Sequence, residues 1–330
     1  MGAKCVVILT GKGDSHSDIV TDRLQSLGEQ IIRLNTDQFF DDQVQIEYEQ
    51  VTKSDRPNVS LWIRGQLLSI ENVKSVWCRR PKPVMVSLVT NNDQRQFAER
   101  ELNEFVLNYY HLLQKTFWVS DLLALERARR KLPQLELASR LGFSVPKTLV
   151  TNQPETIKAF FGACKEQMVY KTLHTPNLVV ENEFLGVQTS IVTKENLEQV
   201  GLISRSGGIF QEYLPKVFEV RVTIIGQEVF SIKIDSQISE TGKIDWREAL
   251  SLGQVSIEPI TLPKQVEEGC LKLVHKYGLQ FGAIDLVFTT DGEFYFLELN
   301  PNGQWYWVEH LTGLPMVASM ANLLARSKVS

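Results

Sequence analysis

The sequence lacks any hydrophobic run long enough to cross a membrane. A spanning helix needs about 20 consecutive apolar residues, and no stretch of this chain approaches that length. The amino terminus, MGAKCVVILTGKGDSHSD, has only a short apolar core before charged residues resume, which is too short for a secretion signal. We therefore expect a cytoplasmic protein with no membrane partner.

Cysteine is also scarce. The four cysteines lie far apart, form no CxxC pair and have no histidine at metal-ligand spacing: Cys5, Cys78, Cys164 and Cys270. This pattern argues against a zinc site and against a disulfide framework. Unpaired, buried thiols in a reducing compartment are the expectation.

An excess of charge of one sign is missing as well. The chain has 35 Lys and Arg against 39 Asp and Glu, a net charge of −4, whereas proteins that coat duplex DNA carry a basic excess. We expect no nucleic-acid partner, although a local basic groove stays open. The sequence also lacks GxxxxGK[ST] and GxGxxG, so Gly11, Lys12 and Gly13 are interpreted as a plain turn after a strand.

Length and periodicity indicate several domains. The 330 residues correspond to two or three domains. CVVILT predicts a buried strand, Ser15 with Asp18 resembles a helix capping box, and 30–35 predicts a second strand. Strand, helix and strand in this order predict a parallel pair with a crossover helix. We expect an N-terminal α/β domain at 1–120, a helical linker with a central lobe at 121–208, and a strand-rich lobe at 209–330.

The rest of the chain alternates further strands and helices. Half-exposed strands are predicted at 44–51 and 59–70, with a turn at Gly65, and helices at about 93–115 and 122–141, the second broken before Pro133. Long strands follow in the last third, with tight turns at 226–227 and 291–292. Two more helices are predicted, at about 262–277 and 314–324.

Two carboxylates and an amide form the strongest candidate site. Glu298 and Asn300 are two residues apart on one predicted strand, so they share a face. The turn at 291–292 folds the preceding strand back and would place Asp285 across from Glu298. Such hard oxygen ligands suit Mg²⁺, which takes the rest of its shell from phosphate and water. A salt-bridged surface hairpin is the structural alternative.

Basic residues upstream support a site for phosphate. Glu219 and Arg221 share a face of another predicted strand, and an arginine beside the carboxylates would clamp phosphate in bidentate fashion. Lys171 lies within a predicted strand, where a buried lysine needs an anionic partner. Lys131 lies at a predicted helix start. A lysine taken singly is more often an ordinary solvated or ion-paired side chain.

The order of these pieces resembles a known family. Lys131, VPKTLVT, Lys171, QEYL, FEVRVTIIG, GAIDLVF and FLELNPNGQW follow one another as in the ATP-grasp superfamily of carboxylate ligases. VWCRRPKP, the DWR at 245–247 and NPNGQWYWVE are similar to the microviridin-type (graspetide) peptide ligases. The resemblance implies an ATP-grasp fold of α/β and α+β parts. A pre-ATP-grasp domain would precede a central lobe and a C-terminal lobe with an antiparallel sheet, and ATP would lie between the two lobes.

The resemblance also implies roles for individual residues. Lys131 and Lys171 would contact the nucleotide, and Glu219 would reach its ribose. The linker that reads adenine would consist of Gln211, Glu212, Tyr213 and Leu214. Arg221 and Arg247 would stabilise the transferring phosphate, and Mg²⁺ would be held by Asp285, Glu298 and Asn300. No enzyme nucleophile is needed, which fits the absence of a Ser-His-Asp or Cys-His pattern.

One segment departs from many ATP-grasp enzymes. The stretch after Lys171 has a single glycine, Gly186, instead of a glycine-rich phosphate loop. It predicts a strand pair with an acidic turn at Glu181 and Glu183, which would bind a basic residue of a leader peptide or be an ordinary solvated tip. Arg79 and Arg80 end a strand and would meet an anionic substrate or pair with surface acids.

The resemblance therefore implies an enzyme that uses ATP and Mg²⁺ on a ribosomal precursor peptide, leader plus core. A Glu or Asp side chain would be activated as an acyl phosphate, and a Ser or Thr hydroxyl or a Lys amine would close an ω-ester or ω-amide macrocycle. A homodimer is also implied. Two alternatives stay open: a ligase for a small amino acid or a protein C-terminal tail, and a non-catalytic nucleotide-binding scaffold.

Overall fold

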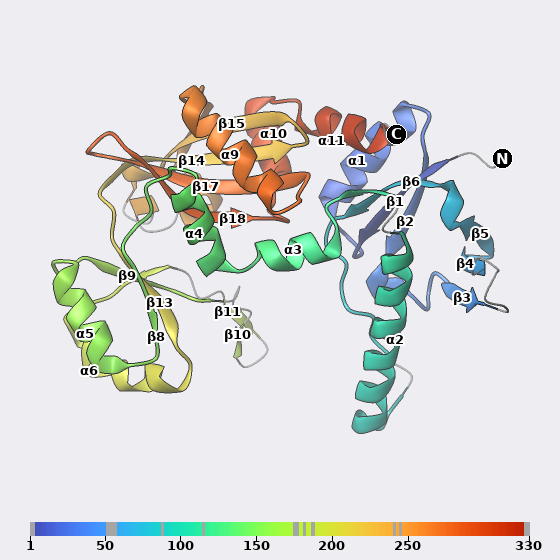
Figure 1. The fold of residues 1–330 in the computed structure, drawn as a ribbon, viewed down its shortest axis with the longest axis horizontal. Coiled ribbons are helices and arrows are strands. Elements are labelled where there is room, and N and C mark those ends of the chain that lie inside the picture. The colour runs from blue at the N-terminus through green and yellow to red at the C-terminus, as the bar shows by residue number, and fades with distance from the viewer. Residues whose placement is uncertain are drawn as a thin grey trace.

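Three structural parts follow one another along the chain in the computed structural model (Figure 1). The structure describes residues 4–50, 58–86, 89–113, 116–173, 178–180, 183–185, 189–239, 242–243 and 246–326. An N-terminal sheet with its helices is joined through a helical link to a central sheet and a C-terminal sheet.

The N-terminal sheet has four parallel strands in the order β2-β1-β6-β7. Their bounds are β1 (Cys5–Thr10), β2 (Gln30–Asn35), β6 (Val73–Cys78) and β7 (Phe117–Val119). Every residue of β1 is buried, because alternate side chains pack in the same cores as α1 (Ser15–Ser26) on one face and α2 (Asn92–Leu112) on the other. The predicted parallel pair of β1 and β2 is confirmed.

The start of α1 differs from the prediction by one residue. The sequence suggested a capping box at Ser15, but Asp14 is the N-cap residue, and its carboxylate accepts a hydrogen bond from the backbone N–H of Ser17 at 3.2 Å. A charged acceptor at this position also interacts favourably with the helix dipole. Ser15 therefore becomes the first residue of the helix.

A small antiparallel sheet branches from this part in the order β3-β4-β5. The strands are β3 (Gln45–Glu49), β4 (Asn58–Ile63) and β5 (Gln66–Ser69), and short 3₁₀ turns flank them at Thr36–Gln38 and Ile70–Asn72. Arg64 and Gly65 both have positive φ, 50° and 77°. This two-residue turn is the one that the sequence predicted at Gly65.

Two short helices link the N-terminal sheet to the remainder of the chain. They are α3 (Leu122–Ala128) and α4 (Lys131–Arg140), so the predicted break before Pro133 is confirmed. The central sheet follows in the order β12-β9-β13-β8. Its elements are β8 (Thr148–Thr151), α5 (Pro154–Ala163), β9 (Met168–Lys171), β12 (Ser190–Ile191), α6 (Lys194–Glu198), a 3₁₀ segment (Val200–Arg205) and β13 (Gly208–Glu212).

The predicted strand pair after Lys171 is also present. β10 (Leu178–Val180) and β11 (Glu183–Leu185) pair in antiparallel fashion. Glu181, which follows β10 in the sequence, lies outside the described residues, and only the backbone of Glu183 is described.

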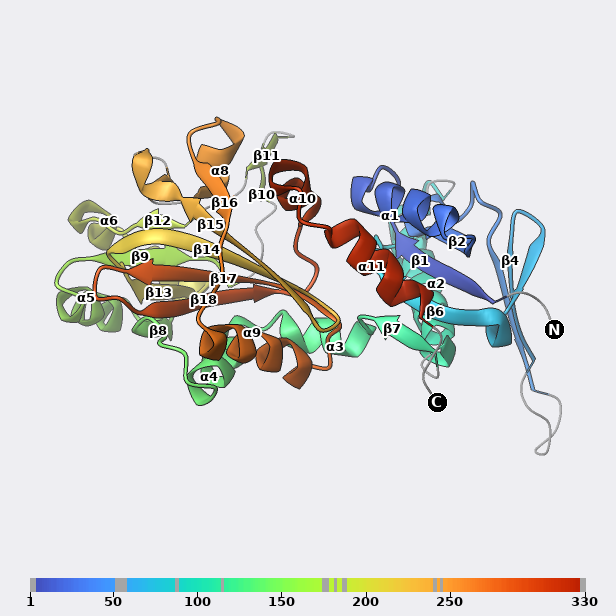
Figure 2. The same cartoon turned by 90° about the horizontal axis from the view of Figure 1, so that it is seen from above.

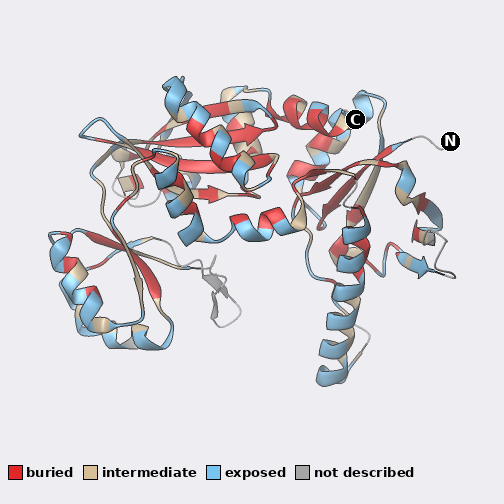
Figure 3. Ribbon diagram, in the orientation of Figure 1, coloured by how far each residue is buried: buried red, intermediate tan, exposed pale blue. Residues whose placement is uncertain are grey.

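The C-terminal sheet is antiparallel throughout, in the order β16-β15-β14-β17-β18. Its strands are β14 (Lys216–Ile225), β15 (Glu228–Asp235), β16 (Ser256–Pro259), β17 (Phe281–Thr289) and β18 (Phe294–Asn300). The helical segments of this part are Ser236–Ile238, α8 (Trp246–Ser251), α9 (Lys264–Lys276), α10 (Tyr306–Thr312) and α11 (Met316–Ala325). The central strands β14 and β17 are largely buried (Figure 3).

The last helix returns to the N-terminal sheet. α11 packs against α1 and β6 (Figure 2). Ser75 Oγ donates to the carbonyl of Leu324 at 2.7 Å, and Lys74 Nζ donates to that of Ala325 at 3.2 Å. The end of α11 is therefore hydrogen-bonded to β6 of the N-terminal sheet.

Two features predicted from composition concern the helices and the cysteines. Over the ranges that the structure describes, no helix has both the length and the apolar content needed to span a bilayer. All four cysteines are buried and unpaired, as predicted.

Candidate active site

One residue from each of three neighbouring strands forms a row across the C-terminal sheet. Arg221 of β14 lies opposite Asp285 of β17, and Asp285 lies opposite Glu298 of β18. The predicted juxtaposition of Asp285 and Glu298 is therefore confirmed. Leu297 has no partner across the sheet, because the register shifts between Asp285 and Leu286. Such bulges are frequent beside functional sites, where they re-aim side chains.

Asp285 is the buried centre of this row. Its Oδ1 accepts a hydrogen bond from Arg221 Nη1 at 2.7 Å, and its Oδ2 accepts one from Arg247 Nη2 at 2.7 Å. Asn300 Nδ2 donates to the same Oδ2 at 3.2 Å. The side chains of Asp285 and Arg221 are each 5% exposed. Removing either one would leave the other charge in the interior with less compensation.

Glu298 is held as a carboxylate by its surroundings. It accepts hydrogen bonds from Arg247 Nη2 at 3.0 Å and Asn300 Nδ2 at 3.2 Å. Burial acts to raise its pKa, but the charges of Arg247, Lys131 and Lys171 outweigh burial and lower the pKa to about 2. Glu298 is therefore ionised at any physiological pH.

Helix α4 brings Lys131 to the row. Lys131 Nζ donates to the carbonyl of Thr172 at 3.0 Å and lies 3.7 Å from Glu298 Oε2. Gln134, one turn later, is buried; its Nε2 donates to the Leu299 carbonyl and its Oε1 accepts from the Leu299 N–H, both at 2.8 Å. Gln134 thus holds α4 against the edge of the sheet. Nothing in the sequence pattern distinguishes this glutamine.

Lys171 adds a fourth cation at the end of β9. Burial lowers its pKa from 10.5 to about 8; Glu298 opposes this shift, and Lys131 and Arg247 add to it. Four cations, Lys131, Lys171, Arg221 and Arg247, therefore lie around the carboxylates of Asp285 and Glu298. The neighbouring carboxylate of Glu219 has its own cation, Lys216. The excess of positive charge suits an anionic ligand such as a phosphate chain. We call Asp285, Glu298 and the four cations around them the charged cluster.

The donor set fits Mg²⁺. Arg247 Nη2 bridges both carboxylates, 2.7 Å from Asp285 and 3.0 Å from Glu298, which is the position of a shared cation, and its side chain is 47% exposed. Asn300 can present its amide oxygen by an amide flip. No group of three or more His, Cys, Asp or Glu suited to a metal occurs among the described residues. Two carboxylates and one amide are the small set that Mg²⁺ uses beside phosphate.

The predicted adenine linker joins the central and C-terminal sheets. Gln211 Nε2 donates to Thr148 Oγ1 at 2.9 Å. Glu212 is engaged with Lys147, whose N–H donates to Oε1 at 2.8 Å and whose Nζ lies 3.2 Å from Oε2. Its own N–H donates to the Lys147 carbonyl, and that of Tyr213 donates to Gln167. The Glu212 side chain thus secures the linker.

Leu214 leaves a backbone donor for a ligand in this linker. Within the part of the chain that the structure describes, its N–H makes no hydrogen bond. A free backbone N–H can bind an acceptor of a ligand; the contact of this linker with adenine stays a prediction.

Glu219 shares the face of Arg221 on β14. It forms a buried ion pair with Lys216, with Nζ 2.6 Å from Oε1. Burial raises the pKa of Glu219, and the charge of Lys216 opposes this. Its contact with a ribose stays a prediction.

Arg79 is buried and held mainly by backbone carbonyls. It is 1% exposed, and its Nη1 donates to the carbonyls of Asn302 at 2.9 Å and Gly303 at 3.1 Å. The loop after β18 thus covers Arg79, and its Nε lies 3.7 Å from Oδ2 of Asp14, an acid whose side chain is 15% exposed. A contact of Arg79 with a peptide stays a prediction. Arg80 is exposed and donates to the Asn302 carbonyl from Nε and Nη2. Its contact with a peptide stays a prediction.

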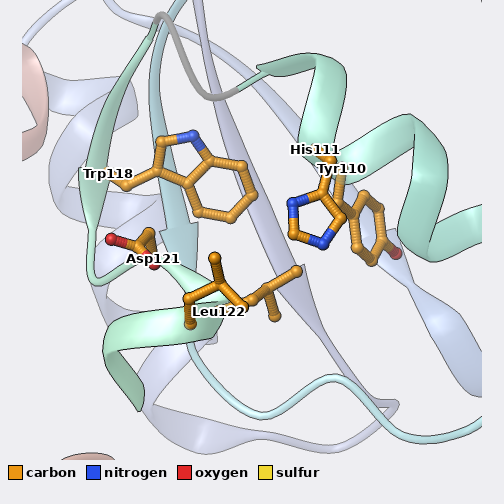
Figure 4. A pocket seen from close by; sticks show the side chains of 6 residues that line it. Tyr110, His111, Trp118, Asp121 and Leu122 are labelled. Carbon is orange, nitrogen blue, oxygen red and sulfur yellow. The ribbon is translucent and has the colours of Figure 1, made fainter. Parts of the chain in front are cut away.

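A shallow depression on the surface lies elsewhere. It is lined by Tyr110, His111, Trp118, Asp121, Leu122 and Leu123, between α2, β7 and α3 (Figure 4). Asp121 caps α3 by accepting from the N–H of Ala124 at 2.9 Å. None of the predicted site residues lines it, so it is separate from the charged cluster.

Comparison with known proteins agrees with this geometry. Residues 5–126 match the model of the MvdD pre-ATP-grasp domain, and residues 128–324 match that of the RimK-like ATP-grasp domain. A probable alpha-L-glutamate ligase 2 of Shewanella amazonensis is 23% identical over 214 residues, which cover 64% of this chain and 67% of that protein.

Two solved structures resemble the whole chain. The macrocyclase MdnC of Microcystis aeruginosa, bound with precursor peptide MdnA, is 27% identical, with a TM-score of 0.84 over 97% of this chain and 99% of that one. A RiPP-associated ATP-grasp ligase of Chryseobacterium gregarium, in complex with ADP and a leader and core peptide, is 26% identical, with a TM-score of 0.88 over 97% and 96%. Since the second family model spans more than half of the residues, the chain belongs to the RimK-like ATP-grasp family, whose ligases use ATP and Mg²⁺.

Proposed function

We propose that this ligase acts on a ribosomally made precursor peptide and closes side-chain macrocycles in it. The observation that carries the proposal is the charged cluster, built from both lobes of the ATP-grasp part in a chain whose full length resembles two peptide-modifying ligases. The cluster supplies a phosphate site and two metal-binding carboxylates without any enzyme nucleophile. Activation of a substrate carboxylate by ATP is the chemistry that such a site supports.

The reaction has two steps. An oxygen of a Glu or Asp side chain attacks the γ-phosphorus of ATP, the bond to the bridging oxygen breaks, and ADP leaves. A Ser or Thr hydroxyl or a Lys amine of the same peptide then attacks the carbonyl carbon of the acyl phosphate. Phosphate leaves with one former carboxylate oxygen, and the nucleophile loses its proton. Each ring therefore removes one water from the peptide.

The residues of the cluster divide this work. Lys131 and Lys171 hold the phosphate chain as point charges, and Arg221 and Arg247 stabilise the charge on the transferring phosphoryl group. Asp285, Glu298 and Asn300 would hold Mg²⁺, which would supply positive charge against the phosphate chain. The low dielectric around buried Asp285 and Arg221 strengthens these interactions.

Peptide recognition is proposed for the β10–β11 pair and the N-terminal part. Glu181 follows β10 in the sequence and Glu183 begins β11. Both would bind a basic residue of the leader. Reversing both charges should weaken leader binding and leave ADP binding unchanged. Equal leader affinity in the variant would contradict this role.

Intact-mass spectrometry with ADP measurement tests the proposal. The enzyme is incubated with ATP, Mg²⁺ and a precursor peptide rich in Glu and in Thr or Lys. The peptide should lose one water for each ring, and one ADP should form with each ring. Asp285→Asn should slow ring formation by about a hundredfold or more, whereas Asp291→Asn, at the exposed turn of the same hairpin, should not. No change in peptide mass, or water loss without matching ADP, would contradict the proposal.

A ligase for a small amino acid or a protein C-terminal tail is the second candidate. The observation that favours it is the similarity of 64% of the chain to probable α-glutamate ligases. Such an enzyme needs no leader. ADP formation with free amino acids, in the absence of any peptide, would support this candidate and contradict the first.

We also propose a homodimer in the cytoplasm. The four free, buried thiols suit a reducing compartment. α2 extends away from the N-terminal sheet (Figure 1) and carries exposed Phe97, Phe105 and Leu112, which another copy would cover. Sedimentation should give twice the chain mass, and Phe97→Glu should give the single mass. A monomeric wild type would contradict the dimer.

A further inference from the structure

The chain's own backbone lies against the carboxyl edge of the N-terminal sheet, at the point between the segments that follow β1 and β6. We call this point the crevice. β1 is followed through α1 by β2 on one side, while β6 lies on its other side. In open α/β sheets, the crevice at such a point receives a ligand. Here it receives residues 301–305, which we call the junction loop, between β18 and α10.

Two side chains from the crevice hold the junction loop by its backbone. Arg79, immediately after β6, donates to the carbonyls of Asn302 and Gly303. His16, in the first turn of α1, accepts at Nε2 from the N–H groups of Trp305 at 3.0 Å and Tyr306 at 3.1 Å. His16 therefore provides the acceptor that the start of α10 needs.

The acceptor role fixes the state of the imidazole. A nitrogen that accepts two N–H groups carries no proton, so the ring proton lies on Nδ1, which faces Asp14 Oδ1 at 3.7 Å. Burial lowers the pKa of His16 to about 3, Arg79 adds to this shift, and Asp14 opposes it. The ring is therefore a neutral acceptor throughout the physiological range.

Burying the charge of Arg79 to hold a loop costs free energy. It is 1% exposed, and its Nε and Nη2 have no hydrogen-bond partner among the described residues; the nearest acid, Asp14, has Oδ2 3.7 Å from Nε. Burying an arginine with incomplete pairing costs stability that apolar packing would not. This cost is accounted for if the function requires the junction loop to be held in one position.

The requirement comes from the charged cluster, which contacts the other side of the junction loop. The Gln304 carbonyl accepts from Arg221 Nη2 at 3.2 Å. A Cβ atom at Gly303 would lie 2.7 Å from Arg221 Nη2 and 2.8 Å from the Cβ of Ala283. The loop thus touches the arginine that pairs with Asp285, and it begins directly after Asn300.

We propose that His16 and Arg79 are positioning residues for the ligase site, acting through the junction loop on Arg221 and Asn300. The N-terminal domain is then a structural part of the phosphate site. This inference rests on the ligation proposed above. It goes beyond that proposal in assigning work at the reacting centre to residues of another domain.

Paired substitutions separate positioning from mere folding. His16→Gln keeps an acceptor for the two N–H groups, whereas His16→Leu removes it; Arg79→Met removes the donors of Arg79. His310→Gln and Arg140→Met, both exposed, are the matched controls. Ring formation is measured as kcat and as KM for peptide, and Mg·ADP affinity is measured by calorimetry without peptide.

We expect His16→Leu and Arg79→Met to lower kcat by about 10-fold to 100-fold and to weaken Mg·ADP binding, as loss of supporting contacts does at metal sites. KM for peptide should stay unchanged, and His16→Gln should retain most of the activity. Folded His16→Leu with wild-type kcat and Mg·ADP affinity would overturn the inference, as would His16→Gln as defective as His16→Leu.

The controls keep the two proposals distinct. If His16→Leu does not fold, the other two variants test the inference. His16→Gln should then retain most of the activity, and a folded Arg79→Met with wild-type kcat and Mg·ADP affinity would overturn the inference. A wild type that binds Mg·ADP but forms no rings contradicts the peptide substrate alone, and calorimetry still tests the positioning residues.

Discussion

At the scale of single residues, the site is a balance of buried charges. Asp285 is shared between Arg221 and Arg247, and Glu298 between Arg247 and Lys131. Arg247 is the partner common to both carboxylates and the more exposed of the two arginines. Asp285 and Glu298 would hold a divalent cation, and Arg247 would then pair with a phosphate. The ion pairs seen here and the proposed bound state therefore use the same groups.

Lys171 makes nucleotide affinity depend on pH. Its pKa of about 8 means that the free protein loses this charge above pH 8, so an anion must then bind together with a proton. We expect ADP affinity to fall with each pH unit above 8, by at most about tenfold. Lys171→Arg stays charged and should flatten the profile.

Calorimetry between pH 7 and 9.5 measures this effect. Lys158→Arg, on the surface of α5, should keep the wild-type slope. An affinity of the wild type that is constant over this range would contradict the role of Lys171.

At the scale of elements, three contacts position β18. Gln134 of α4 completes the hydrogen bonding of β18 at Leu299, β17 pairs with its other side, and the junction loop fixes its end. The strand that carries Glu298 and Asn300 is thus restrained along its length. Restraint of this kind is what a preorganised site requires.

Gly303 tests the end of this strand. An alanine there would meet Arg221 and Ala283 at less than the contact distance of real atoms, so the arginine must move. We expect Gly303→Ala to lower kcat by about 10-fold to 100-fold, since small misplacements at reacting centres have such effects. Gly162→Ala, in α5 with open space around it, should leave kcat unchanged; an equal effect of the two would contradict the account.

At the scale of the whole molecule, the N-terminal part is joined to the ATP-grasp part twice. α11 packs on α1 and β6, and the junction loop lies at the crevice beside β1. In both contacts, residues from the last quarter of the chain hold residues from its first quarter. The two matched domains therefore share one site, with Arg79 and His16 from the first and Arg221 and Asn300 from the second.

This joint should weaken in acid. Above pH 6.5, His16 is neutral in both folded and unfolded chains; between 6.5 and about 3, only the unfolded chain binds the proton, so the free energy of unfolding falls as pH falls. At pH 5 the loss from His16 is about 2 kcal/mol. Urea unfolding at pH 7 and 5 should show a smaller loss for His16→Gln than for the wild type.

The matched variant for this measurement is His310→Gln, at an exposed position. It should keep the full wild-type loss. An identical decrease in all three proteins would contradict the assignment to His16.

The sequence reveals the parts of the site that depend on strand spacing. The row of Asp285 and Glu298 follows from period-two alternation and the turn at 291–292, and the break before Pro133 follows from backbone chemistry. Gln134, His16 and the burial of Arg79 could not be predicted, because each depends on which distant backbone packs against it. The predicted N-cap, Ser15, is one residue later than the observed one, Asp14. The sequence does not separate them, because Asp and Ser are both good N-cap residues.

The most direct test of the central claim follows an oxygen atom. A precursor peptide with ¹⁸O in its Glu and Asp side-chain carboxylates is incubated with the enzyme, ATP and Mg²⁺, and the released phosphate is analysed by mass spectrometry. Activation as an acyl phosphate predicts one ¹⁸O in phosphate for every ring formed. Rings that form while all phosphate stays unlabelled would contradict the mechanism.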